Sequence, residues 1–212
     1  GCANPPPPQA ADIGVARPAD ISVDFNAKRI VRQSAHGDAG VAGRAVTLDD
    51  PVRVASISKM IVALTVMRLV DEGRLDLDRN IESYLGYAMR HPEFPDAPLT
   101  LRMLLSHRSG ITDGIEYYLL PLDADIGESM KDSKAWSVGR KPGSWYHYSN
   151  LNFPVVAAVM EAATGERFDR LVASRVIQPL KLDACFNWQT GCSAARWKSA
   201  VTLLRTNGDL AR

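Results

Sequence analysis

The sequence lacks long hydrophobic runs and lacks a bias toward either sign of charge. No apolar stretch reaches the roughly 18 residues that a membrane-spanning helix needs. The 25 Lys and Arg residues nearly balance the 24 Asp and Glu residues, which gives a net charge of +1, and neither sign forms a long run. Because nucleic acids and anionic membrane surfaces attract clusters of basic residues, we expect neither of them as a partner.

The sequence also lacks the motifs of several enzyme classes. No pair among its four histidines has a metal-binding spacing such as His-x-x-x-His. The Gly-x-Ser-x-Gly motif of α/β-hydrolases is missing, as are the P-loop and the dinucleotide-binding fingerprint. We therefore expect neither a metal ion nor an organic cofactor.

Cysteine is scarce, with three residues in 212, and the first of them is Cys2. It precedes "ANPPPPQAAD", a Pro-rich segment that can pack neither as a helix nor as a strand, so we expect a tether over residues 1–18. A cysteine at a processed N-terminus before such a tether is typical of a lipid-anchored bacterial lipoprotein. The alternative is an untethered tail with an incidental free thiol.

The other two cysteines, Cys185 and Cys192, lie seven residues apart in "DACFNWQTGCS". This spacing in a loop suits a small disulfide ring in an oxidising compartment, and the alternative is two unpaired thiols. Together with Cys2, the pair predicts a location in the bacterial cell envelope, either periplasmic or lipid-anchored.

Hydrophobic residues make up 46% of the chain, so one domain, or two interleaved subdomains, can bury a sizeable core. The patterns predict a β-hairpin from residues 20–25 and 29–35, and helices over residues 57–71, 101–107, 154–165 and 167–180. A second hairpin is predicted around the Asn207-Gly208 turn, and the chain would end inside it. This order indicates an α+β domain over residues 19–212 that is part of a larger folded unit. The alternative is a short edge strand that is native.

Ser56 stands three residues before Lys59 at the predicted start of the helix over residues 57–71. Residues three apart share a helix face, and the positive helix N-terminus favours an alkoxide. A serine hydroxyl needs a base, and removal from water favours the neutral amine that could act as one. We therefore predict a nucleophile and its base. The alternative is a chance motif, which arises roughly once in a chain of this length, with Ser56 as a helix cap.

A second motif, Tyr148-Ser149-Asn150, lies on a loop just before the helix predicted over residues 154–165. A phenol near a lysine can relay a proton, and an asparagine amide can hydrogen-bond both lysine and substrate. The alternative is a turn tyrosine and a capping asparagine. We expect Ser149 to be a turn residue and His107 to bond backbone carbonyls at a helix end.

Four stretches in order carry a resemblance to a known family: "VRVASISKMIVAL", "LTLRMLLSHRSGIT", "PGSWYHYSNLNFPVVAAVMEAATGERFDRLV" and "IQPLKLDAC". Over about residues 20–190 the chain resembles the serine β-lactamases and penicillin-binding proteins, in the branch of class C β-lactamases, family VIII carboxylesterases and D-aminopeptidases. The tyrosine that begins the second motif points to this branch and away from class A.

The resemblance implies an antiparallel sheet flanked by helices, with a helical subdomain. It implies that Ser56 is the acylated nucleophile, Lys59 its base and Tyr148 the proton relay, with Asn150 orienting Lys59 and substrate. The substrate would be a small ester, a β-lactam or a D-amino-acid peptide.

The sequence departs from the family at its third motif, Lys-Thr-Gly or His/Trp-x-Gly, whose strand supplies an oxyanion-hole N–H opposite that of Ser56. The only similar stretch, "QTG" at residues 189–191, lies in the candidate disulfide loop. The family's remaining strands and last helix are also missing, so we expect a further C-terminal part of the fold. The alternatives for this part are a separate chain, a lost fragment or disordered residues. Two hypotheses remain: a serine hydrolase, or a non-catalytic binding or scaffold protein on the same fold.

Overall fold

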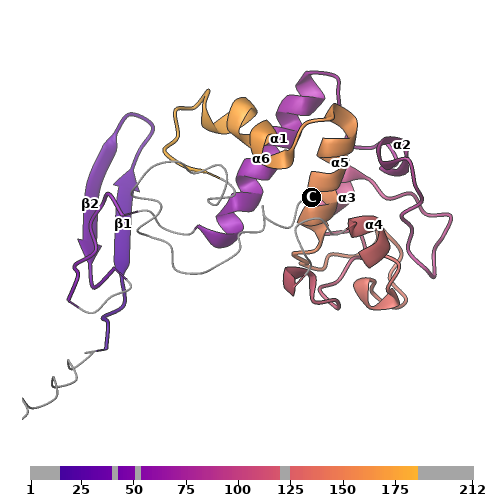
Figure 1. The fold of residues 1–212 in the computed structure, drawn as a ribbon, viewed down its shortest axis with the longest axis horizontal. Helices are drawn as coiled ribbons and strands as arrows, with labels where there is room; N and C mark the ends of the chain where they lie inside the picture. Colours follow the sequence, from indigo (N-terminus) through magenta and orange to yellow (C-terminus); the bar gives the residue numbers. More distant parts are fainter. Residues whose placement is uncertain (1–14, 40–42, 51–53, 120–124, 186–212) are drawn as a thin grey trace, which may run out of the picture. The chain divides into compact units, whose positions relative to one another are not determined.

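The computed structural model describes residues 15–39, 43–50, 54–119 and 125–185 (Figure 1). The first two ranges belong to one compact unit and the last two to another. The tether over residues 1–18 and the single domain over residues 19–212 stay predictions, because residues 1–14 and 186–212 lie outside the described part. The predicted hairpin at Asn207-Gly208 lies outside it as well.

The first unit contains the predicted β-hairpin, formed by β1 (Asp20–Phe25) and β2 (Ile30–His36). The strands pair antiparallel, and the register shifts between Asp24 and Phe25 beside the turn. The Asn26 side chain accepts hydrogen bonds from the backbone N–H groups of Lys28 and Arg29, at 2.9 and 3.0 Å, and so closes the turn. The alternating pattern therefore identified both strands to within one residue.

The second unit is helical. Its α-helices are α1 (Ser58–Asp71), α2 (Glu82–Leu85), α3 (Leu101–Leu105), α4 (Ile126–Ser129), α5 (Asn152–Thr164) and α6 (Phe168–Val172). Single 3-10 turns cover Ala55–Ile57, Tyr117–Leu119 and Ser133–Ala135, and a π-helical turn covers Ala173–Ile177. Of the helices in the described ranges, none is long and apolar enough to cross a membrane.

Helix α1 continues from the 3-10 turn at Ala55–Ile57, which confirms the helix predicted over residues 57–71. It buries one face, made of Val62, Thr65, Val66 and Leu69. Gly73 ends it with a φ of +68°, a conformation that costs glycine little. Burial of this single face fixes the rotation of the helix, and with it the direction of the side chains in its first turn.

Helix α5 is the centre of the second unit, and it packs against α2, α3, α4 and α6 (Figure 1). It is buried almost all round, as expected for a helix whose residues are apolar on every side. It ends at Thr164, with Gly165 as the predicted stop directly after it, and begins at Asn152, two residues before the predicted start. A buried α5 holds the segment just before it, which contains Tyr148 and Asn150, at a defined place beside the core.

The other two predicted helices are shorter than expected. Thr100 caps α3, as its side chain accepts a hydrogen bond from Met103 N, but the helix ends at Leu105 because His107 takes a left-handed φ of +55°. The helix predicted over residues 167–180 divides into α6 and the π-helical turn. The bend after α3 places His107 against the loop before α5.

Candidate active site

The structure brings Ser56, Lys59, Tyr148 and Asn150 into one hydrogen-bonded group, which we name the Ser56 cluster. Lys59 Nζ lies 3.1 Å from Ser56 Oγ, and Tyr148 Oη lies 2.8 Å from the same oxygen. Lys59 Nζ also donates to Asn150 Oδ1 at 2.9 Å, and Tyr148 Oη to Asn150 Oδ1 at 3.3 Å. The serine oxygen therefore contacts two groups that can each take or return its proton.

Within the Ser56 cluster, the serine is open to solvent and the lysine is less exposed. Ser56 is exposed and Tyr148 is 43% exposed, whereas Lys59 is half-buried. Lys59 Nζ lies over the rings of Tyr148 and Phe153, 5.1 and 5.2 Å from their centroids. These aromatic faces exclude water from part of the amine and attract it when it is charged. A substrate can thus reach Ser56 Oγ while the amine stays in place.

Tyr148 is prepared for proton transfer by its neighbours. Burial alone would raise the pKa of its phenol. The hydrogen bonds with Lys59 and Ser56 and the positive charge of Lys59 outweigh burial, and the net shift of the Tyr148 pKa is downward. A phenol of lowered pKa gives up its proton more readily, which suits a residue that protonates a leaving group.

Ser56 lies in the turn that leads into α1, behind a strained residue. Ala55 has a φ of +44°, in the left-handed region that residues other than glycine rarely adopt. The leading N–H groups of a helix have no acceptor within the helix and carry its positive dipole end. An oxyanion formed at a carbonyl attached to Ser56 Oγ would lie in this field.

Sequence reasoning missed Asp113, which holds the loop of the second motif. Its Oδ1 accepts hydrogen bonds from Ser149 Oγ at 2.7 Å and Leu151 N at 2.9 Å, and its Oδ2 accepts from Asn150 Nδ2 at 2.9 Å. Burial would raise the pKa of the Asp113 carboxyl, but these donors outweigh it and lower the pKa. No local pattern marks Asp113, because its partners lie 36 to 38 residues away.

The expectation for His107 is wrong. Its Nδ1 accepts a hydrogen bond from Ser149 N at 3.3 Å, instead of bonding the carbonyls of the preceding helix, and its ring packs on Tyr148 with centroids 4.5 Å apart. Burial, and then the positive charge of Lys59, lower the pKa of the His107 imidazole. Ser149 is not a turn residue either, as it is fully buried between His107 and Asp113.

A sequence profile of the family described as Beta-lactamase matches residues 16–208 of the chain. The chain belongs to the beta-lactamase family.

Among the relatives, Esterase EstB of Burkholderia gladioli is 33% identical over 162 residues, which are 68% of this chain and 40% of EstB. The structure of a D-stereospecific amidohydrolase from a Streptomyces species is similar with a TM-score of 0.56 and 29% identity, covering 72% of this chain and 47% of that one. The chain spans 26% to 42% of the length of the curated relatives that it matches.

The fold class expected for a member of the beta-lactamase family is confirmed. A beta-lactamase/D-alanine carboxypeptidase from Yersinia pestis is similar with a TM-score of 0.70, covering 91% of this chain and 56% of that chain. At 21% identity this likeness supports the fold alone. The described residues contribute an antiparallel hairpin and the helical part of the α+β fold.

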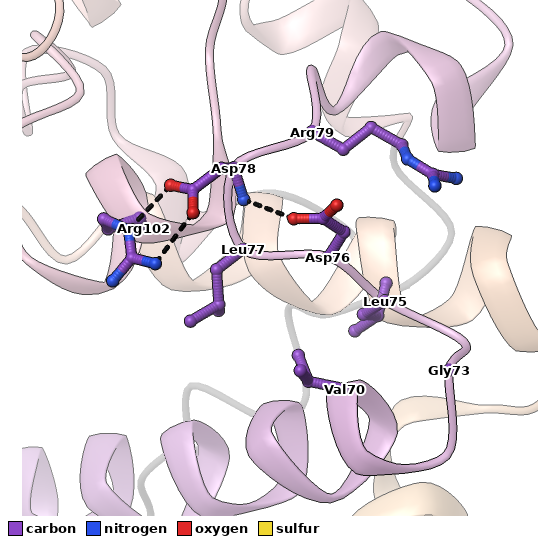
Figure 2. A pocket seen from close by; sticks show the side chains of 8 residues that line it. All are labelled: Val70, Gly73, Leu75, Asp76, Leu77, Asp78, Arg79 and Arg102. Atoms are coloured by element: carbon purple, nitrogen blue, oxygen red, sulfur yellow. Dashed lines mark hydrogen bonds and ion pairs between the residues drawn. The ribbon is translucent and has the colours of Figure 1, made fainter.

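A hollow at the other end of α1 does not belong to the Ser56 cluster (Figure 2). It is lined by Val70, Gly73, Leu75, Asp76, Leu77, Asp78, Arg79 and Arg102, and we name it the Asp78 hollow. A 14-residue helix is about 21 Å long, so the hollow lies far from Ser56. Within the described ranges, no group of three or more His, Cys, Asp or Glu residues could hold a metal ion.

The cysteine predictions are tested only in part. Cys185 is disulfide-bonded. Cys192, Cys2 and the "QTG" stretch at residues 189–191 lie outside the described residues. The ring between Cys185 and Cys192 and the lipidation of Cys2 therefore stay predictions.

Proposed function

We propose that the chain carries the nucleophile, the base and the proton relay of a serine hydrolase that opens esters or amides through an acyl-Ser56 intermediate. The observation that carries the proposal is the position of Ser56 Oγ, 3.1 Å from Lys59 Nζ and 2.8 Å from Tyr148 Oη. These separations are within reach of direct proton transfer. Membership of the beta-lactamase family and the similarity to Esterase EstB support it.

The acylation step follows from these contacts. In the reactive form of the site Lys59 has lost its positive charge, and its amine takes the Ser56 hydroxyl proton while Oγ forms a bond to the substrate carbonyl carbon. The carbonyl π electrons move to the oxygen, which is stabilised by the helix N-terminus. When the tetrahedral intermediate collapses, the bond to the leaving group breaks. The leaving group takes a proton from Tyr148, which regains one from the Lys59 ammonium.

The deacylation step returns the enzyme to its starting state. Water loses a proton to the same pair of groups as its oxygen bonds to the acyl carbon. The Ser56 ester then breaks, the acid leaves, and Ser56 Oγ recovers a proton. Asn150 contacts both Lys59 and Tyr148, and so keeps the two proton carriers together through both steps.

The first experiment measures covalent labelling by a fluorophosphonate probe, followed by intact-mass measurement. The chain should gain one probe mass, and Ser56→Ala should gain none. Ser58→Ala is the matched control, because Ser58 begins the same helix but lies outside the Ser56 cluster, and it should be labelled like the wild type. Labelling that persists in Ser56→Ala would overturn the assignment of the nucleophile.

The finer substrate class is a further part of the proposal. Similarity to Esterase EstB and to a D-stereospecific amidohydrolase favours an esterase or β-lactamase-like hydrolase of broad range. A panel of p-nitrophenyl acetate, nitrocefin and a D-Ala-D-Ala peptide, with Ser56→Ala as blank, ranks these classes. We expect p-nitrophenyl acetate to be the best of the three, because its leaving group needs the least protonation.

The alternative is a binding or scaffold protein on the same fold. Reversible penicillin binding without a covalent adduct, by a chain that melts cooperatively, would support this alternative.

We also propose that the protein belongs to the bacterial cell envelope. The disulfide at Cys185 supports an oxidising compartment, because cytosolic thiols are kept reduced. Thiol alkylation of protein taken directly from cells, with and without prior reduction, tests this. Full blockage of Cys185 without reduction would contradict it.

A further inference from the structure

We infer that Asp113 is a positioning residue that determines which end of the Asn150 amide faces Lys59. The inference rests on the proposed function, because its consequence for catalysis requires Ser56 and Lys59 to act in acylation. Asp113 itself touches neither Ser56 nor Lys59 by a hydrogen bond in the described part of the chain. Its effect therefore passes through Asn150.

The polarity of the contacts carries the inference. An ionised carboxylate can only accept hydrogen bonds, so the end of Asn150 that faces Asp113 Oδ2 at 2.9 Å must be the NH2 group. The carbonyl end of the amide then faces Lys59 Nζ at 2.9 Å. If the amide turned over, its oxygen would face the carboxylate, and two acceptors would oppose each other. The NH2 group would then face Lys59, which would lose its acceptor. Asp113 therefore selects one orientation.

Asp113 also holds the residues on both sides of Asn150. Its Oδ1 accepts from the Ser149 hydroxyl and from the Leu151 N–H, so one carboxylate binds three consecutive residues. These contacts place the loop before α5 relative to the segment that carries Asp113. Oδ1 of Asp113 holds Ser149 and Leu151, whereas Oδ2 orients the Asn150 amide. Because the two roles use different oxygens, a substitution can separate them.

The backbone beside Asp113 is anchored independently of the loop that it holds. Thr112 N donates to Ala135 O at 2.8 Å, and Thr112 Oγ1 donates to Lys134 O at 2.9 Å. On the other side, a Cβ at Gly114 would lie 1.9 Å from Lys134 O, so only glycine fits this close approach. The carboxylate is thus presented from a fixed support, as positioning requires.

The decisive comparison is between Asp113→Asn and Asp113→Ala. The asparagine variant keeps an oxygen for Ser149 and Leu151 but turns an NH2 group toward the NH2 group of Asn150. The alanine variant removes all three hydrogen bonds of the Asp113 carboxylate. If Asp113 sets the amide orientation, Asp113→Asn should melt closer to the wild type than Asp113→Ala does, and yet lose fluorophosphonate labelling rate as severely, by about tenfold or more.

If Asp113 only stabilised the fold, the two variants would rank differently. In that case the labelling rate follows stability, and Asp113→Asn is the milder variant in both measurements, which would overturn the inference. Asp125→Asn is the matched control. Asp125 also lies in the region between α3 and α5, but its side chain accepts from the nearby backbone N–H of Gly127, at the start of α4. Its labelling rate should equal that of the wild type.

An exchange of the two side chains keeps the test decisive even if labelling fails. In the double variant Asp113→Asn with Asn150→Asp, the amide at position 113 can donate to the carboxylate at position 150, so the hydrogen bond is restored in the opposite direction. In Asn150→Asp alone, two carboxylates face each other. The melting temperature of the double variant should exceed the value for additive effects by at least about 3 °C. Additive effects would overturn the pairing. A wild-type chain that is not labelled refutes the proposed function, and the melting cycle still decides the pairing.

Discussion

The two ends of α1 both gather polar side chains, but only one end has the arrangement of a reactive site. At the N-terminal end, Ser56 and Lys59 contact residues 91 and 92 positions away in the sequence. At the other end, the Asp78 hollow holds an ion pair between Asp78 and Arg102, whose side chains are 64% and 60% exposed (Figure 2). The hollow has space and charge but no nucleophile held between two proton carriers.

The two regions also lower the pKa of a carboxyl group by different means. At the hollow, the Arg102 guanidinium lowers the pKa of Asp78 through a hydrogen bond in solvent. Near the Ser56 cluster, neutral donors of the loop before α5 lower the pKa of Asp113 against the opposing effect of burial. Exposed ion pairs contribute about 0–1 kcal/mol, whereas unsatisfied buried polar groups cost more. The difference teaches that a network of fixed, buried donors distinguishes the end of the helix with the proposed active site better than charged side chains do.

Among the substitutions that test the difference between the two ends of α1, Lys59→Ala should have the largest effect on the labelling rate. Loss of the base should lower the fluorophosphonate labelling rate by about a thousandfold, within the range of general base catalysis. Arg68→Ala is the matched control, because Arg68 is an exposed cation in the last turn of the same helix, toward the hollow. Its rate should stay within about twofold of the wild type. A Lys59→Ala variant that labels at nearly the wild-type rate would instead make Tyr148 the base.

An intermediate effect concerns pH and His107. Its pKa in the folded protein is lowered, so the unfolded chain takes up a proton first as the pH falls. The stabilisation is therefore present above the unfolded pKa of about 6.5 and is lost as the pH falls below it, toward the folded pKa. Melting temperatures between about pH 5 and 8 should fall less steeply for His107→Asn than for the wild type.

The control for this pH series is His36→Asn, which changes an exposed histidine of the hairpin. It should keep the wild-type slope. If the melting temperature of His107→Asn changed with pH as steeply as that of the wild type, this would contradict a role for the neutral His107 ring in holding the loop before α5.

The smallest expected effect is at the hollow. Asp78→Asn removes the ion pair with Arg102 and should change the melting temperature only slightly, because an ion pair between exposed side chains contributes little to stability. Its labelling rate should equal that of the wild type, since the hollow takes no part in the proposed chemistry. A tenfold lower labelling rate in Asp78→Asn would show that the Asp78 hollow affects the reactivity of Ser56, contrary to the difference drawn between the two ends of α1.

Much of the fold could be predicted from the sequence because its signals are local. The 3–4 residue spacing of apolar side chains identified α1, alternation identified the hairpin, and Gly73 and Gly165 marked helix ends. The pairing of Ser56 with Lys59 is local too, since both belong to one helical turn. The boundaries of α3 and α6 were less accurate, because the left-handed His107 and the π-helical turn leave no such periodic signal.

The remaining parts of the site were decided by the tertiary structure. The sequence contained Tyr148 and Asn150 as a motif but gave no sign of the role of Asp113 or of the partner of His107. The packing of α5, most of which is buried, brought Tyr148 and Asn150 to the first turn of α1. It brought Ser149, in the loop before α5, to Asp113 and His107. Periodicity and capping act over a few residues, whereas a hydrogen bond across 36 or 92 positions exists only after the core has packed. The residue types were therefore determined by the sequence alone, and their orientation toward one another by the folded core.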